Sequence, residues 1–151
     1  MLEPEERKNP SPDVGLRGYV AGVLDCEGSI WISQKPALSG RSQYTLRISV
    51  VNTRKALPVW FANTFWGTST QYDRGNEKWK TEKRWACAGK RAAEVLRFAL
   101  PYLVVKREQA KLGLEFASTH VDYGKHIPDA FHEHRERIHS AMAELNKRGR
   151  T

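Results

Sequence analysis

A helix ends and a strand begins within VAGVLDCEGS, residues 20–29. The apolar residues of this stretch have helical spacing, and the helix that contains them is predicted to run from Leu16 to Asp25. Two of its features are unfavourable in an ordinary helix. Gly22 in the helix interior costs about 1 kcal/mol relative to alanine, and the carboxylates of Asp25 and Glu27 oppose the helix dipole at its C-terminal end. A sequence that accepts both costs is expected to gain something elsewhere.

Close helix packing and metal binding are the two gains that fit this stretch. Two such helices side by side would bring both copies of Glu27 together at their shared ends, and paired carboxylates bind divalent cations well. The alternative is a helix that ends in two solvated acids, which is the commoner arrangement. The residues that would line the packed face lie three and four positions apart: Gly18, Ala21, Gly22 and Asp25.

Alternation of apolar and polar residues predicts two strands directly after this helix, from Ser29 to Lys35 and from Gln43 to Val51. We expect an α+β domain in the order helix, strand, strand, helix, strand, strand, helix, with a four-stranded antiparallel sheet covered by helices on one face. Residues 16–151 are expected to form this one domain, and residues 1–15 a flexible lead-in. The later elements are predicted at Arg54–Trp66, Thr68–Tyr72, Lys80–Ala88, Lys90–Leu100, Lys106–Thr119 and about 128–148.

The sheet face that points away from the helices is predicted to be polar and basic. Strands can enter the major groove of DNA as helices do, so this face is a candidate DNA-reading surface. An ordinary solvated sheet face has the same pattern, and the two interpretations have equal weight. Alternation leaves open whether Trp85 and Cys87 face the core, with Arg84 toward DNA, or the reverse. The candidate DNA contacts are Trp31, Ser33, Lys35, Gln43, Thr45, Arg47, Ser49, Tyr72, Arg74 and Arg84.

The composition is that of a basic globular protein. A net charge of +8 and a pI near 9.7 suit a polyanionic partner such as nucleic acid, although a basic soluble protein without such a role has the same balance. No apolar run approaches the roughly 20 residues of a membrane helix, and we do not expect the acidic N-terminus to act as a signal peptide, which has positive charge followed by an apolar stretch. Two cysteines without a CxxC motif make no disulfide framework. We expect an intracellular protein, in a prokaryotic cytoplasm or an organelle matrix.

Two stretches of the chain resemble the LAGLIDADG homing endonuclease family. The sequence VAGVLDCEG, residues 20–28, is similar to the motif that names the family, with conservative changes at the positions that differ. The sequence LPYLVVKREQA, residues 100–110, is similar to the LPYLxxKxxQA segment of the single-motif, homodimeric members. The intervening elements match in order and length, so the resemblance spans about Arg17 to Phe116. Four motif residues match outright: Ala21, Gly22, Asp25 and Gly28.

The resemblance implies a DNA endonuclease that depends on a divalent metal, with the sheet as a DNA-binding saddle. Glu27 matches the acid that binds the metal in the family, and Cys26 would offer only its backbone carbonyl. Asp25 is not carried over as a ligand and is expected to cap or pack at the helix interface. Mg²⁺ is the expected cation because it prefers oxygen ligands, and Ca²⁺ or Mn²⁺ could substitute in a crystal.

The resemblance also implies roles for polar residues elsewhere in the chain. The family places a polar amide after the second strand to orient the attacking water, and Asn52 occupies this position; it could equally start the turn before the next helix. A basic residue further on helps hold water and phosphate, and both Arg54 and Lys55 qualify. Lys106 matches the active-site lysine that stabilises charge near the scissile phosphate, with a solvated lysine at a helix start as its alternative.

The implied reaction is hydrolysis of phosphodiester bonds in a long pseudo-palindromic DNA site, leaving short 3′ overhangs. Such proteins act as homodimers and spread the intron or intein that encodes them. The presence of Glu27, Asn52 and Lys106 favours an active nuclease. An RNA maturase or a DNA-binding protein that no longer cuts would have the same fold. A small basic scaffold protein, the remaining alternative, leaves both matched stretches unexplained.

Overall fold

The computed structural model describes residues 13–38, 40–72, 81–121 and 125–148. Its strands form one antiparallel sheet in the order β1-β2-β4-β3, which confirms the predicted α+β class. Residues 1–12 of the predicted lead-in, and the loop that holds Arg74, lie outside the described residues. In chain order the elements are α1 (Val14–Glu27), β1 (Gly28–Pro36), β2 (Ser42–Asn52), α2 (Ala56–Phe65), β3 (Thr68–Tyr72), β4 (Glu82–Ala88), α3 (Lys90–Ala99), the short 3₁₀ helix η2 (Leu100–Tyr102), α4 (Arg107–Ala117) and α5 (Asp129–Arg148).

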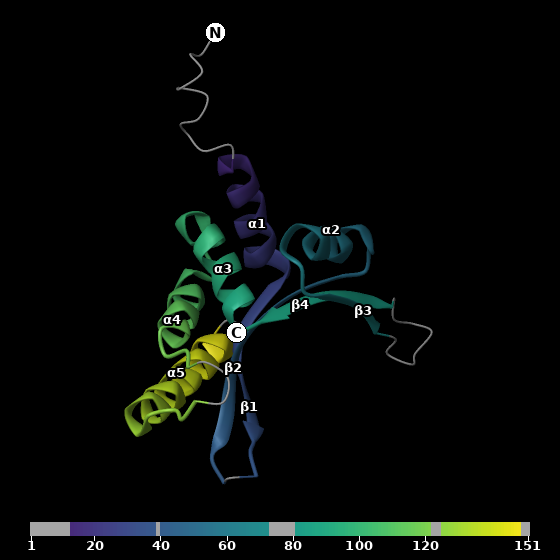
Figure 1. Cartoon of the computed structure of the whole chain (residues 1–151). Coiled ribbons are helices and arrows are strands. Elements are labelled where there is room, and N and C mark those ends of the chain that lie inside the picture. The colour runs from purple at the N-terminus through teal and green to yellow at the C-terminus, as the bar shows by residue number, and fades with distance from the viewer. Residues whose placement is uncertain (1–12, 39, 73–80, 122–124, 149–151) are drawn as a thin grey trace.

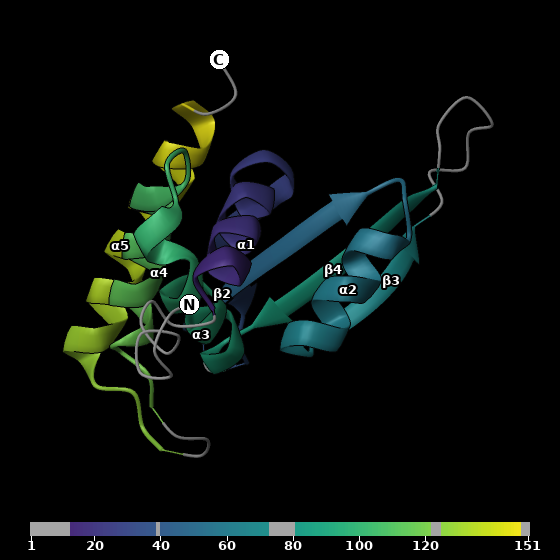
Figure 2. The same cartoon turned by 90° about the horizontal axis from the view of Figure 1, so that it is seen from above.

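The helices cover one side of a strongly bent sheet. Figure 1 shows the β1–β2 hairpin and the β3–β4 pair running in different directions, with no helix in the angle between them. Seen from above, α1 and α2 lie over the strands, while α3, α4 and α5 lie beside them (Figure 2). The uncovered concave side is the face that alternation predicts to be polar.

The core lies between the helices and the inner face of the sheet. Alternate residues of β1 and β2 are buried there because side chains along a strand point to opposite faces. Trp85 and Cys87 of β4 are also buried, at 0% and 7% exposure, so the question that alternation left open is settled: they face the core and Arg84 faces outward. Burial raises the pKa of the Cys87 thiol to about 12, so this cysteine is not a reactive thiolate.

α1 is two residues longer at each end than predicted, and Gly28 ends it. The backbone of Gly28 is extended, with a φ of −91°, so the glycine is not needed for a left-handed turn. It is needed for space, because a Cβ at this position would lie 2.6 Å from the backbone oxygen of Leu24. The chain therefore passes directly from helix to strand, which puts the end of α1 against the start of β1.

α2 ends in an unusual backbone conformation. Trp66 has a φ of 60° and Gly67 a φ of 90°, both in the left-handed region. The carbonyl of Trp66 accepts a hydrogen bond of 2.6 Å from the buried indole Nε1 of Trp85. Because an unpaired indole N–H in the core would be costly, this bond offsets the strain at Trp66 and fixes how α2 joins β3.

We predict that Gly67→Ala destabilises the protein more than Gly40→Ala. Both glycines have positive φ, so each alanine costs about 1–2 kcal/mol in backbone strain. A Cβ at Gly67 would also meet the backbone oxygen of Ala86 at 2.6 Å, whereas nothing lies within 4 Å at Gly40. The free energy of unfolding, measured with urea, should fall by about 1–3 kcal/mol more for Gly67→Ala. Equal losses would contradict the close contact.

Candidate nucleic-acid interface and metal-binding residues

The Asp25 carboxylate joins the end of α1 to the loop before α4. Its Oδ2 accepts a hydrogen bond from the backbone N–H of Val104 (3.0 Å), and its Oδ1 accepts from those of Val105 (3.0 Å) and Lys106 (2.9 Å). The Nζ of Lys106 returns a bond of 2.8 Å to the backbone oxygen of Asp25. An acid that is unfavourable at the end of its own helix therefore stabilises the N-terminal end of another, where N–H groups lack partners.

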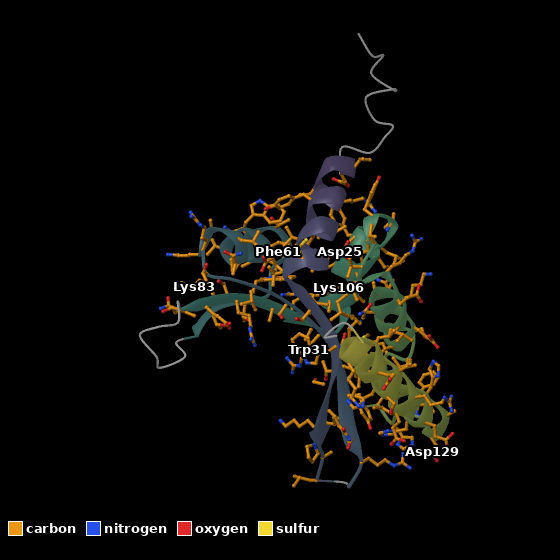
Figure 3. All side chains as sticks on the ribbon, turned by 180° about the vertical axis from the view of Figure 1, so that it is seen from behind. Asp25, Trp31, Phe61, Lys83, Lys106 and Asp129 are labelled. Carbon is orange, nitrogen blue, oxygen red and sulfur yellow. The ribbon has the colours of Figure 1, made fainter. Side chains whose placement is uncertain are left out.

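This contact brings together the two sequence stretches that carry the family resemblance. Asp25 and Lys106 are separated by about 80 residues along the chain, and Figure 3 shows them next to each other at the lower end of α1. Glu27, the last residue of α1, is exposed at the same end, and its neighbour Cys26 is exposed as well. Lys106 is half-buried. The exposed carboxylate of Glu27 and the ammonium group of Lys106 thus lie at the same end of α1.

The helix-packing face predicted on α1 stays a prediction, and its four residues have different surroundings within one chain. Ala21 is fully buried in the core, and the carboxylate of Asp25 accepts hydrogen bonds from the loop before α4. Gly18 and Gly22 do lie on an open side of α1, since a Cβ at either would meet nothing within 4 Å. Cys26 continues this face one turn after Gly22. The three residues Gly18, Gly22 and Cys26 are called the α1 stripe below.

Asn52 is the last residue of β2, and its side chain starts the following turn. Its Oδ1 accepts a hydrogen bond of 2.8 Å from the backbone N–H of Arg54. This turn explains why α2 begins at Ala56, two residues after the predicted start, and it leaves Arg54 and Lys55 exposed. Lys83 is paired with Asn52 in the strand register. No pattern in the sequence singles out this lysine, because only the register of β4 on β2 places it beside Asn52.

The polar face of the sheet is built from cross-strand pairs. Register pairs Trp31 with Arg47, and the Nε of Arg47 donates a bond of 2.9 Å to the Ser33 hydroxyl. That hydroxyl donates a bond of 3.3 Å to the backbone oxygen of Thr45, so the Arg47 side chain is held against its neighbours. The face also bears exposed side chains that can donate to DNA bases or phosphates: Lys35, Gln43, Arg47 and Arg84.

Three of the predicted DNA contacts are buried or lie outside the described side chains: Ser49, Tyr72 and Arg74. Ser49 is only 3% exposed, because it lies on the central strand between Ser29 and Ala86, so it offers almost no surface. Arg74 lies outside the described residues, and so does the side chain of Tyr72. Within the described ranges, no group of three or more histidine, cysteine, aspartate or glutamate residues is placed to hold a metal ion. Of the two α1 carboxylates described at this end, that of Asp25 accepts three backbone hydrogen bonds and that of Glu27 is exposed.

Comparison with known proteins gives matches in structure. No family model and no curated protein matches the sequence. I-CvuI, a homing endonuclease solved with DNA in the presence of Mg, superposes with a TM-score of 0.69 and 20% identity over 88% of this chain and 83% of its own. I-Vdi141I, an archaeal intron-encoded homing endonuclease complexed with DNA, superposes with a TM-score of 0.71 and 14% identity over 87% of this chain and 84% of its own.

The chain has the LAGLIDADG homing endonuclease fold. The meganuclease I-SmaMI, solved bound to DNA, gives a TM-score of 0.65 and 14% identity over 94% of this chain but 52% of its own. I-GzeII, a LAGLIDADG homing endonuclease, is covered over 44% of its length. The LAGLIDADG fold therefore occurs in chains of about this length and in chains about twice as long.

None of the helices that the structure describes is long and apolar enough to cross a membrane.

We predict that Asp25→Asn destabilises the protein and Glu27→Gln does not. The asparagine keeps one acceptor oxygen and loses both the charge and the second oxygen, leaving a backbone N–H of the 104–106 loop without its partner. The expected loss is about 1–3 kcal/mol in the free energy of unfolding. Glu27 is exposed, so Glu27→Gln should stay within about 0.5 kcal/mol of wild type. Urea unfolding measures both, and an unchanged Asp25→Asn would contradict the assigned role.

Proposed function

We propose that the protein is a site-specific double-strand DNA endonuclease that depends on a divalent metal and works as a homodimer. The observation that carries the proposal is the contact between Asp25 and the loop before α4. It holds Lys106 at the end of α1, where Glu27 is exposed. The polar sheet face supports the proposal because it offers basic and amide side chains on the concave side of the same fold.

Residues at the end of α1 suit a cation that prefers oxygen ligands. Glu27 would hold Mg²⁺ through its carboxylate, and Cys26 would add its backbone carbonyl, because the last carbonyls of a helix have no partner within it. The fold neighbour I-CvuI was solved with Mg and with Ca. When bound, the cation would supply charge stabilisation and a more acidic water.

Other residues of the chain would complete the site. The Lys106 ammonium would stabilise negative charge that develops on the scissile phosphate. Asn52 would orient the attacking water with its amide group, since only its Oδ1 is engaged in the turn. Arg54 or Lys55, both exposed at the start of α2, would hold the phosphate. The reaction would hydrolyse a phosphodiester bond in each DNA strand and leave short 3′ overhangs.

The polar face would read the DNA. Arg47 is held by Ser33, so its guanidinium loses less freedom when it binds a guanine edge or a phosphate. Lys35, Gln43 and Arg84 would add contacts along the same face, and the net charge of +8 favours a strong salt dependence. A symmetric dimer would read a long pseudo-palindromic site. Cutting such a site would spread a host intron or intein.

A second copy of the chain would pack against the α1 stripe. The absence of side chains at Gly18 and Gly22 lets two helix backbones approach closely, and Cys26 lies on the same side, next to Glu27. Two copies would bring two Glu27 carboxylates together, which one copy cannot do. The doubled length of I-GzeII and I-SmaMI relative to this chain agrees with an assembly of two such units.

We predict that the wild-type chain cuts DNA only with a divalent cation and that Glu27→Gln abolishes cutting. A plasmid library with random inserts is incubated with excess protein and Mg²⁺, and the ends of linear products are sequenced to identify the target. On a plasmid with that target, Glu27→Gln should bind with near wild-type affinity but give no linear product, because the cation loses its anionic ligand. Lys106→Ala should slow cutting and keep the metal requirement.

The matched control for this experiment is Glu108→Gln, an exposed acid of α4 whose removal should leave cutting unchanged. Cutting at the wild-type rate by Glu27→Gln would contradict the assigned metal ligand. Binding of the library without cutting, with Mg²⁺ or Mn²⁺, would contradict the endonuclease proposal and favour a non-cutting DNA-binding protein.

We also predict that mild oxidation links two chains through Cys26. Residues on a stripe near a two-fold axis lie close to their own copies, so two Cys26 thiols would come within reach of a disulfide. Wild type and Cys87→Ser should give a linked dimer on a non-reducing gel, and Cys26→Ser should not, since Cys87 is buried. Gly22→Leu should prevent both linking and dimer sedimentation. A wild-type chain that sediments as a monomer, with and without DNA, would contradict the proposed assembly.

A further inference from the structure

A cavity of about 960 Å³ lies beside the start of β2, between α3, α4 and the segment that leads into α5. It is separate from the proposed catalytic end, since neither Glu27 nor Lys106 lines it. Of the described residues that line it, three are histidines, five are lysines or arginines, and one is an acid, Glu94. The lysines and arginines that line it are Arg41, Lys90, Arg97, Lys125 and Arg135.

Arg135 is a buried cation without an acidic partner among the described residues. It is 9% exposed, and its guanidinium donates to the hydroxyl and the backbone oxygen of Thr119 and stacks on the Phe116 ring at 5.2 Å. Burial lowers the pKa of Arg135. Among the described residues, only neutral groups hold this buried charge, and such an arrangement is costly. An anion in the cavity that Arg135 lines would offset this cost.

Two more cationic side chains of the cavity lining also favour an anionic ligand. Lys90 and Arg97 lie on the exposed side of α3, two turns apart, and both line the cavity. Arg41 is in a different situation because it forms an exposed ion pair of 2.7 Å with Asp129. Lys90, Arg97 and Arg135 thus line the cavity from two helices, and among its described lining residues Glu94 is the one carboxylate that could compensate them.

The cavity is also bounded by an unpaired strand edge. β2 pairs with β4 only from Arg47 onward, and the last contact on this side is a bond of 2.9 Å from the Gly89 N–H to the Leu46 oxygen. The segment from Ser42 to Thr45 therefore has no neighbouring strand on this side in the described chain, and its four residues line the cavity. A ligand there would lie against polar residues of this strand edge as well as cations.

We propose that this cavity binds a nucleotide-sized phosphorylated ligand, with its phosphates at Lys90, Arg97 and Arg135. The volume is in the range of small-molecule sites. Arginine and lysine are the side chains that recognise phosphate. The same chemistry is offered by a free nucleotide and by one nucleotide of a single strand. The ligand would contact the edge of the DNA-reading face, because Gln43 and Thr45 also line the cavity.

Isothermal titration of the full chain with ATP, pyrophosphate and adenosine tests this site. ATP and pyrophosphate should bind, and adenosine, which lacks phosphate, should not. Arg97→Ala and Lys90→Ala should each weaken ATP binding about tenfold or more, as expected for a lost charge-assisted hydrogen bond. Both residues are exposed, so these variants should fold. Lys111→Ala is the matched control, because Lys111 is an exposed cation of α4 outside the cavity, and it should bind ATP as wild type does.

Competition distinguishes the source of the ligand and separates this site from the DNA-reading face. A short single-stranded RNA that displaces ATP would identify a strand segment as the ligand, and one that does not would identify a free nucleotide. Arg47→Ala, on the DNA-reading face, should leave ATP binding unchanged. Failure of both ATP and pyrophosphate to bind would overturn the proposal. Equal weakening by Arg97→Ala and Lys111→Ala would also overturn it, since it would show general charge attraction only.

Discussion

Three backbone N–H groups converge on the carboxylate of Asp25, and the arrangement of the proposed catalytic end of α1 depends on this convergence. These bonds join the end of α1 to the start of α4, and they fix the position of the loop between η2 and α4. The Lys106 side chain is then fixed on the backbone of α1, and Glu27, two residues beyond Asp25, is left exposed. The α1 stripe stays open because this contact and the core use the other sides of the helix.

Most of the fold could be predicted from the sequence because burial imposes a period on each element. The inner faces of β1 and β2 alternate cleanly, so both strands were predicted to within a residue at each end. Helix ends were less predictable, since they depend on contacts that are distant or unusual. α2 begins where the Asn52 turn allows, and it ends where the buried Trp85 indole binds the carbonyl of Trp66.

The site was predictable only in part. Resemblance singled out Glu27 and Lys106, but spacing alone assigned Ala21 to the open face of α1, because it does not say on which side the core lies. The partner of Asp25 lies about 80 residues away, beyond the reach of any local pattern. The basic cavity was missed for the same reason: its cations come from separate segments that only the packing of α3, α4 and α5 brings together.

The most direct measurement is a crystal structure of the protein bound to a duplex that it cuts, grown with Ca²⁺, the cation present with I-SmaMI on its uncleaved target. Two chains should meet through the α1 stripe, with a cation within about 2.3–2.6 Å of a Glu27 carboxylate oxygen. Asp25 should keep its bonds to the 104–106 loop, and the polar sheet face should lie in the DNA groove. A cation held by other acids, or an α1 stripe facing solvent, would contradict the account.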